Sequence, residues 1–143
     1  MNELISAYAD AIRAVAASVH DVYDGEWSDR EWERLVVDFE SLAHADEPRT
    51  SSISFAIARA PDGPLEKVSF SLSADAEEAF MRINHIMQAQ KGNYWSTCQV
   101  IVEPDGHYDF QFDYGPPYRL SGNLNDTRYR NYLDRYMAEM GQR

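Results

Sequence analysis

The sequence predicts a single α+β domain, residues 1–143, with helices packed on one face of an antiparallel sheet of about five strands. Two features predict this class. Segments whose apolar residues recur at every second position, typical of strands, are interspersed with segments whose apolar residues recur at steps of three and four, typical of helices. Turns rich in proline, aspartate and glycine separate strand segments and favour antiparallel hairpins. The predicted element order is α-β-β-β-α-β-β-α.

The chain begins with a predicted amphipathic helix that ends near Gly25. Its apolar residues follow steps of four and three, so they form one stripe that can cover a core from one side. The stripe comprises Leu4, Tyr8, Ile12, Val15, Val19 and Val22.

Three strands are predicted next, over residues 32–42, 52–58 and 67–72, and they form an antiparallel meander. The turn between the second and third is Pro-Asp-Gly-Pro, residues 61–64. Alternate apolar residues are expected to face the core. These are Leu35, Val37 and Phe39, then Ile53, Phe55 and Ile57, then Val68, Phe70 and Leu72. Asp38 and Glu40 fall on the other side of the first strand.

A second helix is expected to begin after Ser73, whose hydroxyl can accept a hydrogen bond from an otherwise unpaired backbone N–H. The acidic residues in its first turn favour the positive end of the helix dipole. Its apolar stripe comprises Ala76, Phe80, Ile83 and Met87. Gly92 lies just beyond its expected end.

A hairpin follows, and its loop Pro104-Asp105-Gly106 sets the register of both arms. Three loop residues make Glu103 face His107. Counting outward, the expected pairs are Val102 with Tyr108, Val100 with Phe110, and Cys98 with Phe112. The opposite side of the hairpin then carries Trp95, Thr97, Gln99, Ile101, Glu103, Asp109, Gln111 and Asp113. This side is acidic and partly aromatic.

The last element is a helix that Asp126 can cap, after the sequence Gly115-Pro116-Pro117 has stopped the sheet. Its apolar residues recur at helical spacing. They are Tyr129, Tyr132, Leu133, Tyr136, Met137 and Met140.

Composition limits the classes of function. The net charge is −11, with 24 acidic residues against 13 basic ones, so the electrostatic field should repel nucleic acid and anionic membranes and attract basic partners. No segment approaches the roughly 18 apolar residues of a membrane span, and the N-terminus lacks the features of a secretory signal. We therefore expect a cytoplasmic protein with no nucleic-acid or membrane partner. A single cysteine excludes an internal disulfide.

Motifs for catalysis or cofactors are sparse. Cys98 and His107 are separated by roughly 16 Å along the predicted hairpin, too far for a nucleophile and its base. The four histidines have no metal-ligand spacing and the seven glycines occur singly, so no metal or cofactor is predicted and no enzyme is expected. One pair stays open: Glu103 and Asp109 lie on a diagonal that could serve a small hydrolase.

The acidic side of the hairpin is better suited to protein recognition, because it combines apolar anchors with a charged rim. The acidic segment from Asp21 to Glu47, with Trp27 and Trp32, is a second candidate patch. The predicted partner-binding residues are Trp95, Ile101, Glu103, Asp109, Gln111, Asp113, Asp38, Glu40, Asp29 and Glu31.

The layout of these elements resembles the YezG-like immunity proteins over residues 5–137. The resemblance lies in the N-terminal helix, the strand WERLVVDFES, the acidic helix start, the motif W-x-x-C-x-x-x-V and the hairpin ending in F-x-F-D-Y. It implies a small cytoplasmic bacterial antitoxin, encoded beside a polymorphic or contact-dependent growth inhibition toxin, that neutralises this toxin by direct binding. The family has no catalytic residues to transfer. The Tyr-rich C-terminal segment has no counterpart in that pattern.

We therefore expect an immunity protein that binds a basic toxin domain, a nuclease, through its acidic surface. Two alternatives remain open. One is the Glu103/Asp109 hydrolase, and the other is a structural homo-oligomer that associates through Tyr129, Tyr132 and Tyr136. Without its partner the chain is expected to be a monomer or a weak homodimer.

Overall fold

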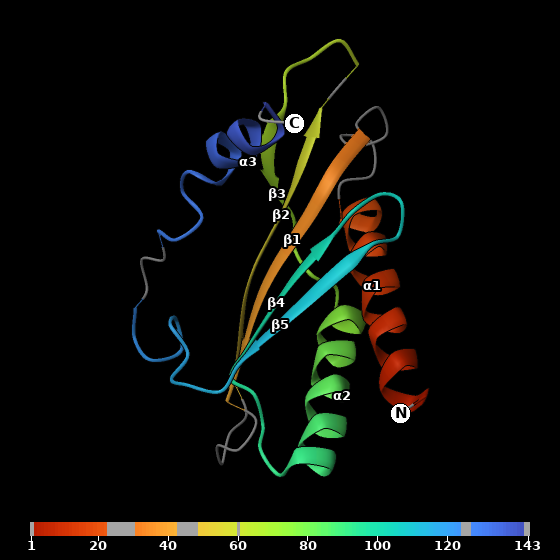
Figure 1. Ribbon diagram of the computed structural model, residues 1–143, viewed down its shortest axis with the longest axis vertical. Coiled ribbons are helices and arrows are strands. Elements are labelled where there is room, and N and C mark those ends of the chain that lie inside the picture. The colour runs from red at the N-terminus through yellow and green to blue at the C-terminus, as the bar shows by residue number, and fades with distance from the viewer. Residues whose placement is uncertain (1, 23–30, 43–48, 60, 124–126, 142–143) are drawn as a thin grey trace.

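The computed structural model describes residues 2–22, 31–42, 49–59, 61–123 and 127–141, and it confirms the predicted class and element order (Figure 1). The elements are α1 (Asn2–Val22), β1 (Glu31–Ser41), β2 (Thr50–Arg59), β3 (Glu66–Ser69), α2 (Ala74–Lys91), β4 (Thr97–Val102), β5 (Tyr108–Asp113) and α3 (Tyr132–Gly141). No helix in the described ranges is long and apolar enough to cross a membrane.

The five strands form one antiparallel sheet in the order β3-β2-β1-β4-β5, so β3 and β5 are its edges. The predicted hairpin register is confirmed: Cys98 pairs with Phe112, and Val102 pairs with Tyr108. At the loop, the Glu103 N–H donates to the His107 carbonyl at 2.8 Å. The loop requires Gly106, because its φ of 95° lies in the left-handed region that glycine adopts without strain.

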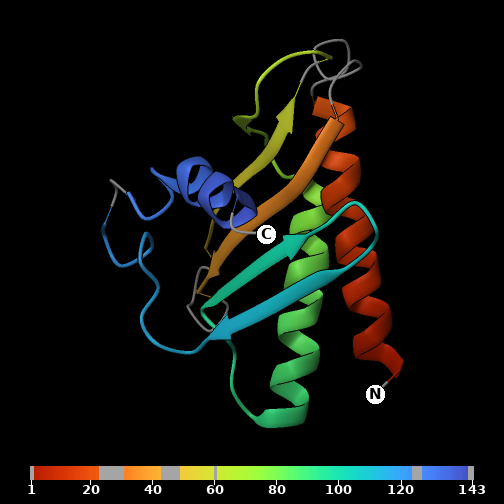
Figure 2. The ribbon, with the colours of Figure 1, turned by 45° about the horizontal axis from the view of Figure 1, so that its top comes forward.

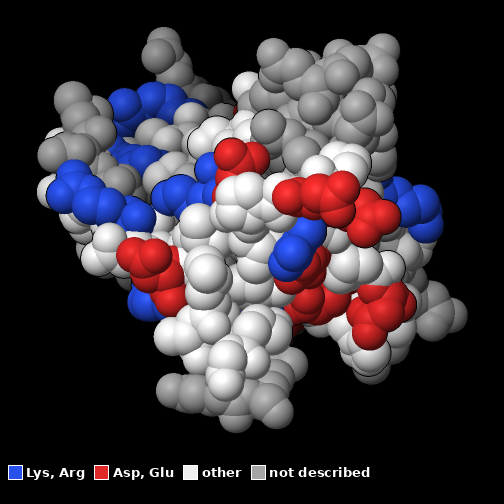
Figure 3. All heavy atoms as spheres, turned by 90° about the horizontal axis from the view of Figure 1, so that it is seen from above, with Lys and Arg blue, Asp and Glu red and all other residues white. Residues whose placement is uncertain are grey.

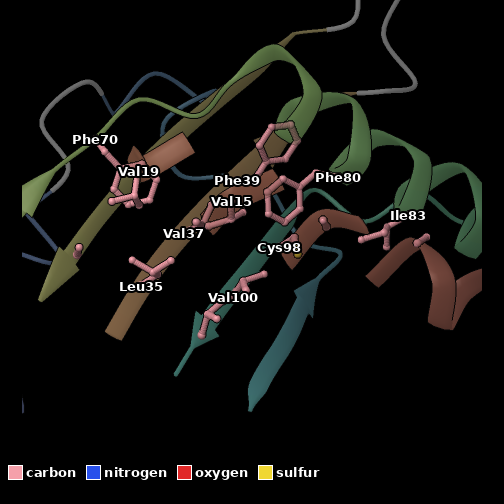
Figure 4. Close-up of a cluster of buried hydrophobic side chains, with 14 of the residues drawn as sticks. Val15, Val19, Leu35, Val37, Phe39, Phe70, Phe80, Ile83, Cys98 and Val100 are labelled. Carbon is pink, nitrogen blue, oxygen red and sulfur yellow. The ribbon is translucent and has the colours of Figure 1, made fainter. Parts of the chain in front are cut away.

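The main core lies between the sheet and the helices α1 and α2 (Figure 4). Helix α2 begins and ends where the sequence predicts. The Ser73 hydroxyl accepts a hydrogen bond from the Ala76 N–H at 3.1 Å, and Gly92 takes the left-handed conformation with φ 89°. Both caps pair backbone groups that a helix end would otherwise leave unpaired. The side chains that fill this core include Val15, Val19, Leu35, Val37, Phe39, Phe80, Ile83 and Val100.

Helix α3 packs on the opposite face of the sheet, so the expectation that the helices share one face holds only for α1 and α2 (Figure 2). The reason is that β1 and β2 are apolar on both sides. Val36 pairs with Phe55, and these two residues form a second core with Ile57 and Tyr136. Phe55 and Ile57 therefore do not share a core with Val37, as a single covered face would require.

Helix α3 also begins later than predicted. It starts at Tyr132, while Asp126, the predicted cap, lies outside the described residues. Tyr129 precedes the helix and packs from a turn onto Phe55, with ring centroids 5.7 Å apart. The helical spacing of apolar residues in the sequence therefore includes Tyr129, which lies in a turn in the structure.

Candidate protein-binding surface

The C-terminal part of the chain covers the sheet face that carries the predicted acidic residues. We call its described residues, 115–123 and 127–141, the C-terminal cover. It crosses β1 and β4 on the side opposite α1 and α2 (Figure 2). Under it, the Asp38 and Glu40 side chains are completely buried. Burial of two carboxylates is costly unless each one is paired with a cation and hydrogen-bonded.

Arg119 supplies most of this pairing. Its guanidinium lies 3.2 Å from a carboxylate oxygen of Asp38 and 3.4 Å from one of Glu40. Glu40 also accepts hydrogen bonds from the backbone N–H groups of Arg119 and Leu120, at 2.8 and 2.9 Å. The same guanidinium donates to the hydroxyl of Ser51 on β2 at 2.8 Å. One arginine therefore ties the cover to β1 and β2.

Arg128 and Tyr129 complete the network around the two buried carboxylates. The Arg128 guanidinium lies 3.4 Å from Asp38 and 4.4 Å from the centre of the Tyr118 ring. The Tyr129 hydroxyl donates to Asp38 and accepts from the Gln99 amide at 2.8 Å. Burial, together with the Asp38 carboxylate, raises the pKa of Tyr129 well above its ordinary value, so it remains a neutral donor.

Asp38 and Glu40 are therefore not part of an exposed surface, and their assignment as partner-contacting residues is wrong for this conformation. The sequence contains a signal for this cover. Five arginines lie after residue 114, against only three acidic residues, so the tail has the charge that the acidic face attracts. The helical spacing of its apolar residues predicts a separate amphipathic helix in this tail, and that pattern does not indicate the role of Arg119.

Trp95 is also buried, with 1% of its surface exposed, and it belongs to the core with Phe39 and Phe112. The prediction extended the alternation of β4 back to residue 95, but β4 begins at Thr97. Before that point the backbone is irregular, and alternation no longer decides which side a residue faces. The Asn84 side chain fixes this turn, because it accepts from the Trp95 N–H at 2.9 Å and donates to the Trp95 carbonyl at 3.0 Å.

Two further predicted residues are only partly accessible. Ile101 packs against the second core under α3. Glu103 forms an ion pair with Arg34, whose guanidinium lies 2.9 Å away and also donates to the Tyr132 hydroxyl at 3.2 Å. The Tyr136 ring lies 4.9 Å from the same guanidinium. The charge of Glu103 is thus largely engaged within the molecule.

The remaining acidic residues of the hairpin lie at the open edge of the sheet. Asp109, Gln111 and Asp113 are exposed on the α3 side of β5. At the hairpin tip, Asp105 pairs with His107 through contacts of 3.0 Å to the backbone N–H and 2.7 Å to the ring. These contacts lower the pKa of Asp105, so it stays ionised. Glu31 is exposed at the start of β1, and Asp29 lies outside the described residues.

Exposed aromatic and aliphatic side chains flank the same edge. Tyr108 and Tyr114 are 43% and 46% exposed, and Ile5 of α1 is 57% exposed. The α1 residue Tyr8 stacks on Phe110 of β5 with ring centroids 4.5 Å apart. Because Ile5 lies three residues before Tyr8, it occupies the same flank of α1. We call the set Asp105, Tyr108, Asp109, Gln111, Asp113, Tyr114 and Ile5 the β5 edge surface.

A polar hollow of about 440 Å³ adjoins this surface on the α3 side. Its floor is formed by β4 and β5 and its wall by the cover. The lining includes Thr97, Gln99, Gln111, Asp113, Tyr118 and Arg128. Because Gln111 and Asp113 belong both to the hollow and to the β5 edge surface, a side chain that lies along β5 can reach into it.

The structure bears on the other chemistry considered from sequence. Cys98 is fully buried and its pKa is raised well above the ordinary value, first by burial, so the thiolate is disfavoured. Among the described residues, no group of three or more histidine, cysteine or acidic side chains could hold a metal ion. The Glu103/Asp109 pair borders a hollow of only about 220 Å³, whereas a hydrolase at this pair would need a deep pocket.

The tyrosines proposed as an oligomer interface are directed inward. Tyr136 is buried, and Tyr129 and Tyr132 pack on the sheet face against Phe55. These three tyrosines therefore pack against other parts of the same chain, so they do not form an exposed surface for a second copy. No protein-family model and no curated protein matches the chain.

Proposed function

We propose that this chain is an immunity protein, an antitoxin that neutralises a cognate bacterial toxin by binding it directly. The observation that carries the proposal is the β5 edge surface, where Asp109 and Asp113 are exposed beside exposed aromatic side chains at an open sheet edge. Interfaces commonly combine such aromatic anchors with a charged rim. The resemblance to YezG-like immunity proteins in strand and turn pattern supports the same role.

The charge distribution favours a basic partner. The sheet carboxylates Asp38 and Glu40 are neutralised by the cover, so the charge available to a partner lies at the β5 edge and in the acidic overall field. Nuclease domains are commonly basic, because they bind phosphate groups. An acidic inhibitor is attracted to such a domain over a long range, which speeds their encounter. The proposed partner is therefore a basic toxin domain with nuclease activity.

The test is to co-express the chain with the product of the toxin gene encoded beside it. A stable complex at micromolar concentration, together with loss of the toxin's nucleic-acid cleavage, is expected. No complex at that concentration would contradict the proposal. Cleavage that continues within a stable complex would contradict the inhibitory role.

Charge reversal tests the surface. Asp109→Lys with Asp113→Lys should slow association with that toxin by about tenfold at low salt and flatten its salt dependence. The matched control reverses Glu78 on α2 and Asp134 on α3, which are also exposed. The control should retain most of the rate. Equal slowing by both pairs would show that net charge acts without this surface.

A further inference from the structure

We propose that the outer edge of β5 binds an extended segment of the basic partner as an added sixth strand. The segment would alternate basic residues with apolar ones. This inference rests on the proposed function and deepens it, because it names the backbone edge that makes the contact and the sequence pattern that the edge recognises.

The first argument is the backbone of β5. Within the described part of the chain, β5 pairs only with β4. The Glu103 N–H donates to the His107 carbonyl, and in an antiparallel ladder such inward-bonding residues alternate with residues whose backbone groups point the other way. Counting from His107, the N–H and C=O groups of Tyr108, Phe110 and Phe112 point away from β4. These are the groups that an added strand pairs with.

The second argument is the charge on the α3 side of this edge. Asp109, Gln111 and Asp113 alternate along the strand and are exposed there. Every second residue of an added strand would lie beside them. Lysine or arginine at those positions complements the carboxylates of Asp109 and Asp113.

The third argument is the apolar flank on the α1 side. The Tyr108, Phe110 and Phe112 side chains lie there with Tyr8. Tyr108 remains 43% exposed, and Ile5 on the same flank of α1 is 57% exposed. The other half of the added strand's side chains would cover this flank, so apolar residues are expected at those positions. The alternation of basic and apolar residues follows from the two unlike sides of one edge.

The same charges argue against a second copy of this chain at the edge. Antiparallel pairing of β5 with β5 would bring Asp109 and Asp113 beside the same carboxylates of the other copy, and like charges directly opposite are destabilising. Charges on an edge strand also discourage self-association in general. The edge therefore selects a partner of opposite charge.

The experiment uses the full chain, labelled for amide NMR, and a peptide of alternating lysine and valine, about seven residues long, whose two ends are acetylated and amidated. The control, called the block peptide, has the same composition and the same capped ends, but its lysines and valines are grouped in two blocks. The alternating peptide is expected to slow hydrogen exchange at the Tyr108, Phe110 and Phe112 amides by about tenfold, and to bind more tightly than the block peptide. Equal binding of both peptides, or protection elsewhere on the chain, would overturn the proposal.

A side-chain variant gives a second test. Ile5→Lys places a charge on the apolar flank and should weaken binding of the alternating peptide by about fivefold. Its matched control is Met137→Lys, on α3 and 51% exposed, which should leave binding unchanged. Equal effects of the two variants would overturn the role of the flank.

The toxin complex separates this inference from the proposed function. A complex that forms but leaves the amides of Tyr108, Phe110 and Phe112 unprotected would overturn only the strand addition. Absence of any complex would contradict the proposed function, while the peptide measurements would still decide what the edge recognises.

Discussion

At the scale of single residues, Asp38 and Glu40 carry a large electrostatic cost, because both carboxylates are fully buried. Arg119 contacts both carboxylates and is the main source of their compensation. A buried ion pair adds little stability compared with apolar residues of the same volume, but removal of one partner leaves an unpaired charge in the interior. The network therefore makes the position of the cover specific.

Replacement of Arg119 by alanine should accordingly lower the free energy of unfolding by about 3 to 5 kcal/mol, because two buried carboxylates lose their main counter-ion. Urea denaturation measures this change. Arg130 is exposed, and Arg130→Ala should change stability by less than about 0.5 kcal/mol. A loss below about 1 kcal/mol for Arg119→Ala would mean that Arg128 alone neutralises the pair.

Ionisation of Tyr136 is expected to make the stability of the fold depend on pH in the alkaline range. Burial, and the hydrogen bond that its hydroxyl donates to Glu33 at 2.9 Å, raise its pKa to about 12. Between pH values of about 10 and 12 the unfolded chain loses this proton while the folded chain keeps it. Stability should therefore be unaffected by this group below about pH 10 and should fall as the pH rises through that window.

The measurement for Tyr136 is thermal unfolding followed over that pH range. Tyr136→Phe removes the group and should make the decline with pH less steep. Tyr108→Phe is the control, since Tyr108 is exposed and should leave the slope unchanged. An unaltered slope in Tyr136→Phe would show that other groups cause the alkaline loss of stability.

At the scale of elements, the β4–β5 hairpin depends on the backbone conformation of Gly106. Apart from Gly106 and its two chain neighbours, no described residue has an atom within 4 Å of a Cβ added there, so the cost of a side chain comes from its φ of 95° and not from a clash. Gly106→Ala should destabilise the protein by roughly 1 to 2 kcal/mol in urea denaturation. Gly141→Ala, at the end of α3 and also unobstructed, should leave stability unchanged or slightly higher. Equal stability of the two variants would contradict the turn argument.

The elements that the sequence predicted correctly are those fixed by local chemistry. The loop residues set the register of Cys98 with Phe112, and Ser73 and Gly92 set the ends of α2. These features depend on neighbours in the chain, which a single sequence displays. The class and element order follow from the same local patterns.

The parts that were predicted wrongly depend on contacts between distant segments. Val36 interrupts the polar side of β1 because α3 covers that side, and the sequence alone does not indicate which elements meet there. Trp95 faces the core because Asn84, eleven residues earlier, holds its backbone. In the sequence, Asp38 and Glu40 match the pattern of residues that face solvent. Only the position of Arg119 in the structure shows that they are buried and paired. Of the candidate site, the exposed carboxylates of β5 were predicted correctly as exposed.

At the scale of the whole molecule, charge is distributed unevenly. Seen from above, lysine and arginine side chains gather mostly on the side where the cover lies, whereas most acidic side chains visible in that view lie toward the other side (Figure 3). The net charge is nevertheless −11. The cover therefore neutralises one sheet face without neutralising the molecule, and the acidic field that remains is available to attract a basic partner from solution.

Salt should act in opposite directions on folding and on association. At a net charge of −11 the folded chain repels itself, and screening relieves this repulsion, while the buried Arg119 network is shielded from added ions. An increase in NaCl from about 0.01 M to about 0.15 M, which shortens the screening length from about 30 Å to about 8 Å, should raise the Tm of the free protein by a few degrees. The same change should slow its association with a basic toxin domain, because the attraction is screened as well.

Calorimetry and stopped-flow mixing measure the two effects on one preparation. A Tm that falls with salt would mean that surface ion pairs outweigh self-repulsion, and an association rate that ignores salt would mean that the acidic field does not guide the partner.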